Sequence, residues 1–149
     1  MKEPIKVNSM ISGGGQPSEE DIAALKAAGY RKIINLRRAG EPNQPLDPHA
    51  QGEVVARAGM AYAHIPVDPK NLDPSSAAAV AKAIEDADGP VYVHCAAGGR
   101  GVSHALLAEA KAQGSSADDV LKKAEALGAP ITDEGFIAFV RASVGEGKK

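Results

Sequence analysis

The chain has 149 residues, and because domains commonly run to about 150 residues, this length predicts a single domain over residues 1–149. Lys and Arg number 17 against 19 Asp and Glu, and this near balance gives no basic surface for nucleic acid or for an anionic membrane. Cys95 is the only cysteine, which excludes an internal disulfide and a zinc site built on cysteine pairs.

A single thiol fits a reducing compartment. The chain has no signal-like start and no apolar run of about 18 residues that would indicate a membrane span. We therefore expect a cytoplasmic protein with neither nucleic acid nor membrane as a partner.

Capping residues, glycines and prolines mark where the predicted helices begin and end. The first helix starts at the near capping box of Ser18 and Asp21 and stops before Gly29. A later helix starts with Asp73 as its N-cap and Pro74 in its first turn. In chain order, the apolar spacing predicts a helix over 18–28, a strand over 32–36, a loop over 37–48, a helix over 49–58, a strand over 61–67, a helix over 74–84, a strand over 90–94, and helices over 101–113, 117–127 and 132–144.

Strands separated by helices of this length are typical of βαβ units. The predicted fold class is therefore α/β, with a central mostly parallel sheet, helices on both faces and additional helices near the C-terminus. Gly13-Gly14-Gly15 has no strong strand before it, so we interpret it as a tight turn and not as a dinucleotide-binding loop. The tail over 145–149 is expected to fray.

The segment Val91–Ser103 shows the clearest pattern for chemistry. In parallel sheets, ligands bind outside the carboxyl ends of the strands, and here a predicted strand runs into Cys95. Small residues including Gly98 and Gly99 follow, and they allow successive backbone N–H groups to converge on an anion. The next helix begins with Arg100, whose planar guanidinium matches two oxygens of a tetrahedral oxyanion. The segment therefore predicts an oxyanion site at a helix N-terminus.

The same groups would activate Cys95 as a nucleophile. The reactive form of cysteine is the thiolate, and backbone N–H groups, the helix dipole and Arg100 all stabilise that form. The alternative is a small buried core residue at a strand end, which is common for free cysteine. The combination of Cys95 with His94, the glycine pair and Arg100 favours the functional interpretation.

The pattern His94-Cys95-x-x-Gly98-x-Arg100 resembles the signature loop of the cysteine-dependent protein-tyrosine and dual-specificity phosphatases. More closely, the chain resembles the small bacterial beta-lactamase-hydrolase-like phosphatases of the DUF442 type. This resemblance covers roughly residues 10–113 and depends on the order and spacing of several segments, namely Gly15–Ser18, Ile33–Arg37 with Glu41, His64–Asp68 and His94–Arg100.

The resemblance implies a two-step phosphatase with the phosphatase fold that needs no metal or other cofactor. The Cys95 thiolate would attack phosphorus to form a phosphocysteine, which water then hydrolyses. Arg100 would hold the phosphoryl oxygens, and Asp68 would protonate the leaving oxygen. The implied partners are a phosphorylated protein or small molecule, with phosphate or sulfate bound at the loop. The implied substrate-binding residues are His94, Ala96, Ala97, Gly98 and Gly99.

Two departures from the phosphatase pattern keep other functions open. Four residues, Ala96–Gly99, separate Cys95 from Arg100, whereas the larger phosphatase class has five. The small bacterial family resembles this chain in its shorter loop, but so do many rhodanese-type sulfurtransferases. Gly101 stands where phosphatases usually place a Ser or Thr that helps to expel the thiolate, and Ser103 lies at a different spacing. The alternatives are therefore sulfur transfer through a Cys95 persulfide and a non-catalytic oxyanion-binding module.

Asp68 and Asp73 are the candidates for the general acid. Asp68 ends a predicted strand that we place next to the strand of Cys95, and the resemblance places the acid in such a loop. An Asp before Pro69 could equally serve only to form a turn. Asp73 is expected instead to cap the helix that Pro74 begins.

Charged side chains and histidines near the strand ends complete the set of candidates. Arg37 and Arg38 could extend a positive rim toward a phosphorylated substrate, or could be a solvated pair. Glu41 could hold Arg37 or Arg100 in place by an ion pair. His94 is expected to hydrogen-bond the loop backbone and to help hold the thiolate. Four scattered histidines and one cysteine do not make a metal site.

Overall fold

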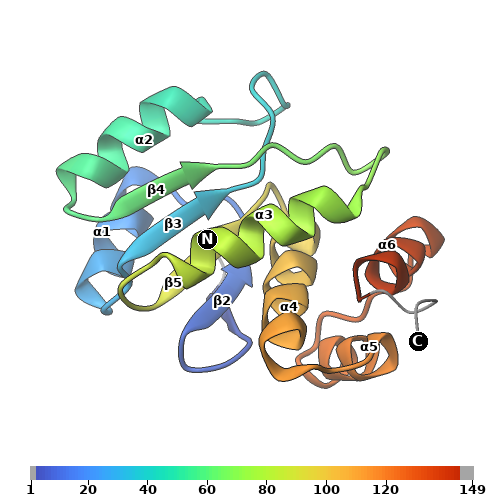
Figure 1. Cartoon of the computed structure of the whole chain (residues 1–149). Coiled ribbons are helices and arrows are strands. Elements are labelled where there is room, and N and C mark those ends of the chain that lie inside the picture. Colours follow the sequence, from blue (N-terminus) through green and yellow to red (C-terminus); the bar gives the residue numbers. More distant parts are fainter. Residues whose placement is uncertain (1–2, 145–149) are drawn as a thin grey trace.

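The computed structural model describes residues 3–144, which form one five-stranded sheet with helices on both faces (Figure 1). The strands lie in the order β1-β2-β5-β3-β4, and every neighbouring pair is parallel except β1 and β2. This arrangement confirms the predicted α/β class with a mostly parallel sheet. The strands are β1 (Ile5–Lys6), β2 (Ile11–Gly14), β3 (Lys32–Asn35), β4 (Ala61–His64) and β5 (Val91–His94).

Each predicted helix is present in the described part of the chain. One face of the sheet carries α1 and α2, and the other carries α3 and α4, with α5 and α6 packed against α4 (Figure 1). The helices are α1 (Glu19–Ala27), α2 (Pro48–Arg57), α3 (Pro74–Glu85), α4 (Gly99–Gln113), α5 (Ala117–Ala126) and α6 (Glu134–Val144).

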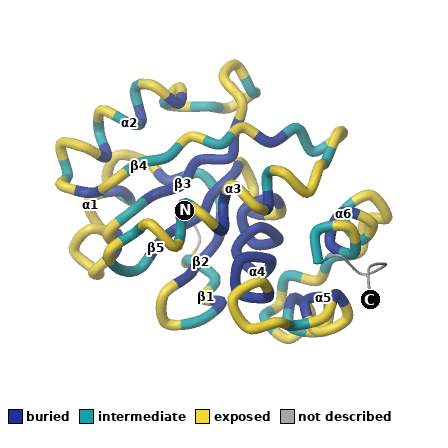
Figure 2. The backbone as a smooth tube through the Cα atoms, viewed as in Figure 1, coloured by how far each residue is buried: buried dark blue, intermediate teal, exposed yellow. Residues whose placement is uncertain are grey.

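Neighbouring residues of the central strands supply two separate cores, because successive side chains of a strand point to opposite faces. Ile33 and Tyr92 belong to the core on the side of α1 and α2, whereas Ile34 and Val93 belong to the core on the side of α3 to α6. Within the second core, α4 is buried over the whole of Arg100–Ala110, and Figure 2 shows it as a dark blue tube. A helix buried on all sides holds its N-terminus in a fixed place.

Side-chain caps determine where the helices begin, as the sequence predicts. The Ser18 hydroxyl accepts from the backbone N–H of Asp21, and the Asp21 carboxylate accepts from the backbone N–H of Ser18, which completes a capping box. Asp73 caps α3 by accepting from the backbone N–H of Ser75 at 2.8 Å.

The prediction of a tight turn at Gly13-Gly14-Gly15 is wrong, because Gly13 and Gly14 lie in β2. Gly13 pairs with Val93 of β5 and Gly14 with His94. The segment lacks the β-branched side chains that favour strands, so a tertiary contact decides its conformation. A Cβ on Gly13 would lie 2.9 Å from the Cα of Val102 in α4, and only glycine allows this approach.

Two further details differ from the sequence predictions. β4 ends at His64, short of the predicted end. Ile65 and Val67 still donate to the carbonyl oxygens of Asn35 and Leu36, but the N–H of Arg37 bonds the side chain of Asn35 and does not continue the ladder. β3 lies between β4 and β5, so the strand that leads to Asp68 is not next to the strand of Cys95. The predicted frayed tail at 145–149 lies outside the described residues. Within 3–144, no helix combines the length and the apolar character that crossing a bilayer requires.

We predict that Gly101→Ala lowers the free energy of unfolding by about 1–3 kcal/mol, the usual cost of overpacking. The new Cβ would lie 2.6 Å from the carbonyl oxygen of Val93, and neither backbone can move away easily. Gly99→Ala is the matched control, because a Cβ there meets no atom within 4 Å and alanine favours helix. Urea unfolding measures the free energy of unfolding of both variants. Equal values for Gly101→Ala and Gly99→Ala would contradict this account of the packing.

Candidate active site

The candidate site lies at the carboxyl end of β5, where the loop Cys95–Gly98 leads into α4. Gly98 is the N-cap of α4 and has φ of 125°, a conformation that only glycine adopts without strain. The loop is fixed to the neighbouring segment after β2, because Gln16 donates its backbone N–H to the carbonyl oxygen of Ala96 at 3.0 Å. Its curvature therefore follows from glycine geometry and from attachment to the sheet.

The sulfur of Cys95 is the point on which the loop converges. The backbone N–H of Gly98 lies 3.1 Å from Sγ and that of Gly101 lies 3.4 Å away, and the residue is 2% exposed. Both donors belong to the first turn of α4, where backbone N–H groups have no partner within the helix. Donors and a helix dipole at this place stabilise a negative sulfur.

Arg100 is held beside the loop by a bidentate ion pair with Glu41. Nη1 lies 2.7 Å from one carboxylate oxygen and Nη2 lies 3.0 Å from the other, while Nη1 also donates to the carbonyl oxygen of Val67 at 3.0 Å. These contacts use three of the five guanidinium N–H groups. The remaining two, one of them on Nε, bond neither Glu41 nor Val67.

Arg100 and Glu41 each stabilise the charged form of the other. Hydrogen bonds from Arg100, and then from the backbone N–H of Arg38 and the side chain of Arg37, hold the pKa of Glu41 far below its usual range despite burial. The contact with Glu41 raises the pKa of Arg100, and the nearby Cys95 sulfur adds to that effect. A fixed positive charge therefore stands next to the thiol before any ligand arrives.

Arg37 is buried and does not form the positive rim that we expected. It is 1% exposed, and its guanidinium binds Glu41 at 3.0 Å, Gln16 at 2.7 Å and the carbonyl oxygen of Pro42 at 2.6 Å. The interpretation of Arg37 as part of a solvent-facing rim is therefore wrong. Its role is to hold Glu41, so that Glu41 pairs with both Arg37 and Arg100.

His94 lies behind the loop, fully buried under Cys95. Its Nδ1 is 3.1 Å from the carbonyl oxygen of Cys95, as expected for a bond to the loop backbone, and burial lowers the pKa of His94 to about 4. Neither ring nitrogen is bonded to the sulfur, and the burial of the ring assigns it to support of the loop.

Gln51 of α2 completes the support of His94. Its Oε1 lies 3.0 Å from Nε2 of the ring. A neutral ring that donates through Nδ1 accepts at Nε2, so the amide must present its N–H₂ group there. That orientation also supplies a partner for the Gln51 amide nitrogen, which otherwise has none. The sequence alone does not predict the contact between His94 and Gln51, because 43 positions separate the two residues.

Asp68 follows the exit from β4, next to the residue whose carbonyl oxygen binds Arg100. Its side chain is 41% exposed, accepts from the backbone N–H of Lys70 at 2.9 Å and lies 3.9 Å from the guanidinium of Arg38. Asp73 faces the backbone of α3 as its cap. Of the two candidate acids, Asp68 is the one whose chain segment touches the arginine of the loop.

Among residues 3–144, no three His, Cys, Asp or Glu side chains come together as a metal site would require. His104 instead bonds the carbonyl oxygen of Arg100 at 2.8 Å and the hydroxyl of Ser76 at 2.8 Å, and so ties α4 to α3. Ser103 donates to that same carbonyl oxygen at 3.1 Å, so its hydroxyl hydrogen is bonded within α4.

Comparison with known proteins identifies the family. Residues 6–113 match the family described as "Beta-lactamase hydrolase-like protein, phosphatase-like domain". The chain belongs to this family. The beta-lactamase hydrolase-like protein of Agrobacterium fabrum (strain C58) is 35% identical over 107 residues, which are 71% of this chain and 25% of that protein. The chain thus spans about a quarter of the length of the curated relatives it matches.

Solved structures share the fold of this phosphatase-like domain. A candidate phosphatase (DUF442) from Shewanella putrefaciens CN-32 has a TM-score of 0.81 at 23% identity, covering 96% of this chain and 91% of that one. A TpbA variant from P. aeruginosa in complex with phosphotyrosine has a TM-score of 0.74 at 15% identity, covering 97% and 86%. The chain therefore has the fold of the protein-tyrosine phosphatases.

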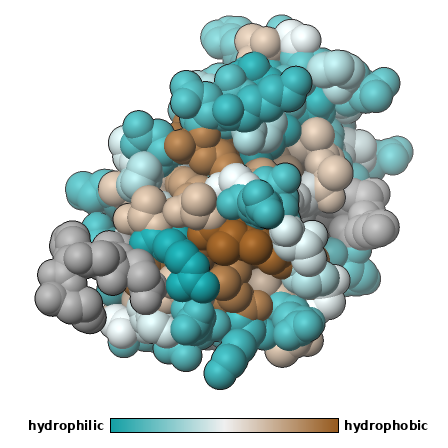
Figure 3. All heavy atoms as spheres, turned by 90° about the vertical axis from the view of Figure 1, so that its right-hand side faces the viewer, coloured by the Kyte–Doolittle hydropathy of each residue, from teal (hydrophilic) through white to brown (hydrophobic). Residues whose placement is uncertain are grey.

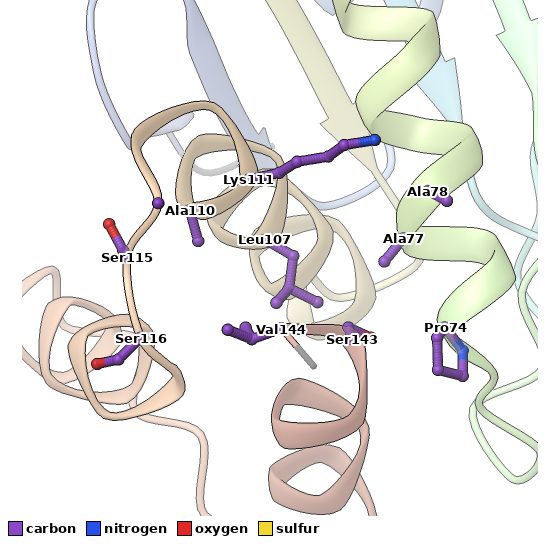
Figure 4. Close-up of a pocket in the computed structure, with 11 residues that line it drawn as sticks. Pro74, Ala77, Ala78, Leu107, Ala110, Lys111, Ser115, Ser116, Ser143 and Val144 are labelled. Atoms are coloured by element: carbon purple, nitrogen blue, oxygen red, sulfur yellow. The ribbon is translucent and has the colours of Figure 1, made fainter. Parts of the chain in front are cut away.

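A cavity of about 510 Å³ lies away from the loop of the phosphatase-like domain, between α3, α4 and α6 (Figure 4). Small residues line most of it, including the serines Ser115, Ser116 and Ser143, and α4 adds Leu107 and Lys111. It contains no acid, histidine or cysteine side chain. Its serines and Lys111 therefore have no carboxylate or imidazole among the lining residues to act as a general base beside them.

We predict that Glu41→Gln lowers the free energy of unfolding at pH 7 by about 3–5 kcal/mol, because it leaves two buried guanidinium groups without their counter-charge. The folded pKa of Glu41 lies below its usual value of 4.5. The stability that Glu41 contributes is therefore fully present above that value and is lost as the pH falls below it. The difference in the free energy of unfolding between wild type and Glu41→Gln should therefore become smaller as the pH is lowered from 6 to 3.

Urea unfolding across that pH range measures the effect, with the exposed Glu125→Gln as the control for loss of a carboxylate. A difference that stays constant with pH would show that the charge of Glu41 is not what stabilises the site.

Proposed function

We propose that this domain hydrolyses phosphate monoesters through a phosphocysteine intermediate on Cys95. The observation that carries the proposal is the convergence of the Gly98 and Gly101 N–H groups on a buried cysteine sulfur, next to an arginine fixed by Glu41. This arrangement favours the thiolate and supplies donors for a tetrahedral oxyanion at the same place.

In the first step, Sγ of Cys95 attacks phosphorus and the bond from phosphorus to the ester oxygen breaks. The loop N–H groups from Ala96 to Gly99 and the free guanidinium donors of Arg100 hold the three equatorial oxygens. Asp68 gives its proton to the leaving oxygen, so that an alcohol or phenol departs. His94 contributes by supporting the loop from behind, where it bonds the carbonyl oxygen of Cys95.

In the second step, water attacks phosphorus, the S–P bond breaks and inorganic phosphate leaves. The carboxylate of Asp68 then accepts a proton from the water. Gly101 places no hydroxyl near the departing sulfur, and the hydroxyl of Ser103 is bonded to a backbone carbonyl oxygen. We therefore expect this step to be the slower one.

For the substrate, we propose a class that is based on proteins with the same fold. A structure of a protein with this fold holds phosphotyrosine, and a phosphorylated protein or small molecule is the corresponding partner of this chain. A second candidate function is sulfur transfer through a Cys95 persulfide, which the four-residue spacing between Cys95 and Arg100 favours.

We predict that Cys95→Ser abolishes the release of phosphate from an aryl phosphate and retains binding of vanadate or phosphate. A serine hydroxyl is not ionised at neutral pH and cannot replace the thiolate as a nucleophile. Colorimetric phosphate release and the rise in melting temperature with added phosphate measure the two properties. Turnover that survives in the serine variant would overturn the covalent mechanism. Formation of thiocyanate from thiosulfate and cyanide, far in excess of phosphate release, would assign the chain to sulfur transfer.

We predict that Asp68→Asn slows hydrolysis of alkyl and tyrosine-type phosphates by about 10²- to 10⁴-fold, the usual range for loss of a general acid. Nitrophenyl phosphate should be affected much less, because its leaving group departs without a proton. The variant should also flatten the alkaline limb of the pH–rate profile. Asp73→Asn is the matched control, because asparagine also caps helices well. If Asp73→Asn is impaired on poor leaving groups while Asp68→Asn is not, the assignment of Asp68 is wrong.

A further inference from the structure

A groove of about 440 Å³ opens directly beside the loop. The loop residues Ala97, Gly98 and Gly99 form one of its walls, and the end of β2 at Gly14 continues that wall. The opposite wall is the connection between α5 and α6 over 129–133 together with the first turn of α6. The groove and the anion loop therefore share residues, so a group attached to a bound phosphate can enter it.

The walls of the groove are largely apolar. Ile5, Val102, Ile131 and Phe136 line it, and all of them except Val102 are only partly buried. On the face that carries α6, Figure 3 shows hydrophobic side chains exposed between hydrophilic ones. Apolar surface next to an anion site is suited to the organic part of a ligand, because burying it is favourable.

Phe136 stands apart from the other aromatic residues of the chain. Tyr30 and Tyr92 are buried in the core under α1 and α2, Phe139 is buried in the second core, and Tyr62 packs against the first core and bonds Asn35. Phe136 belongs to neither core and faces the groove. No local pattern in the sequence marks Phe136, because the fold brings it to the groove from 38 positions beyond Gly98.

The charged residues that line the groove are all acidic. Glu3 and Asp133 are the charged residues among those that line it, and no Lys, Arg or His is present there. Arg38 and Arg100 do not line the groove, and they pair with the carboxylates of Glu41 and Asp68. A second anionic group on a ligand would meet carboxylates in the groove, and like charges repel.

We propose that the groove is the leaving-group subsite, and that it selects phosphate monoesters of an aryl or bulky alkyl alcohol that carries no second anionic group. This inference rests on the proposed phosphatase function. Phe136 and Ile131 provide the apolar contact, and Glu3 and Asp133 discriminate against bisphosphates, nucleotides and acidic phosphopeptides.

The test uses phosphonates, which occupy the anion loop and cannot be hydrolysed. By calorimetry at low salt, benzylphosphonate should bind the wild-type chain about tenfold more tightly than methylphosphonate, as expected for burial of a phenyl ring. para-Carboxybenzylphosphonate should bind about threefold more weakly than benzylphosphonate because of the carboxylates. Replacing Asp133 by Asn and Glu3 by Gln together should remove that penalty. Asparagine retains the bond that Asp133 accepts from the backbone N–H of Phe136.

Phe136→Ala should bring the ratio of benzyl to methyl affinity close to one. Ile137→Ala is the matched control, because this neighbouring residue of α6 is half-buried and lies outside the groove, and it should retain the wild-type ratio. Equal affinity of the wild type for the two phosphonates, tightest binding of the carboxylated ligand, or an unchanged ratio in Phe136→Ala would each overturn the subsite. Because these measurements require no turnover, a chain that prefers benzylphosphonate and hydrolyses no ester would overturn the proposed function and leave the subsite standing.

Discussion

The first turn of α4 lies directly on the backbones of β2 and β5, and the candidate site depends on this contact. A Cβ on Gly13 or Gly101 would meet backbone atoms at 3.0 Å or less, so only hydrogen atoms fit between the helix and the sheet. The close approach directs the N–H groups of Gly98 and Gly101 at the sulfur of Cys95. The same packing leaves no room at position 101 for a side chain with a hydroxyl. In the proposed mechanism, the thiolate of Cys95 therefore departs without a hydroxyl donor from this position.

Glu41 connects this loop to two other parts of the chain. Its carboxylate binds Arg37 at the end of β3 and Arg100 at the start of α4, and Arg100 in turn binds the carbonyl oxygen of Val67 beyond β4. The arginine of the anion site is therefore in place without a ligand, and little reorganisation is needed when an oxyanion binds. The exit of β4 is held at the loop by the same contact, and Asp68 follows Val67 there, outside the lining of the apolar groove.

The sequence predicts the parts of this structure that depend on neighbouring residues. Caps such as Ser18 and Asp73 and the apolar runs of three strands give the helices and strands, and the loop from Cys95 to Arg100 is a continuous segment. β2 was not predictable, because its glycines are held in a strand by contact with α4 and not by their own preference. Pairs that lie far apart in the chain, such as Arg100 with Glu41 at a separation of 59 residues, become visible only when the fold is known.

The central claim is that phosphate is transferred to Cys95, and the most direct measurement is to trap that species. The chain is mixed with an aryl phosphate, quenched in acid during turnover and digested, and the peptide that contains Cys95 is examined by mass spectrometry. The account predicts a peptide heavier by one phosphoryl group, with the modification on Cys95, because hydrolysis of the S–P bond is the slower step. Release of phosphate with no phosphorylated Cys95 at any time, or a phosphoryl group on another residue, would contradict it.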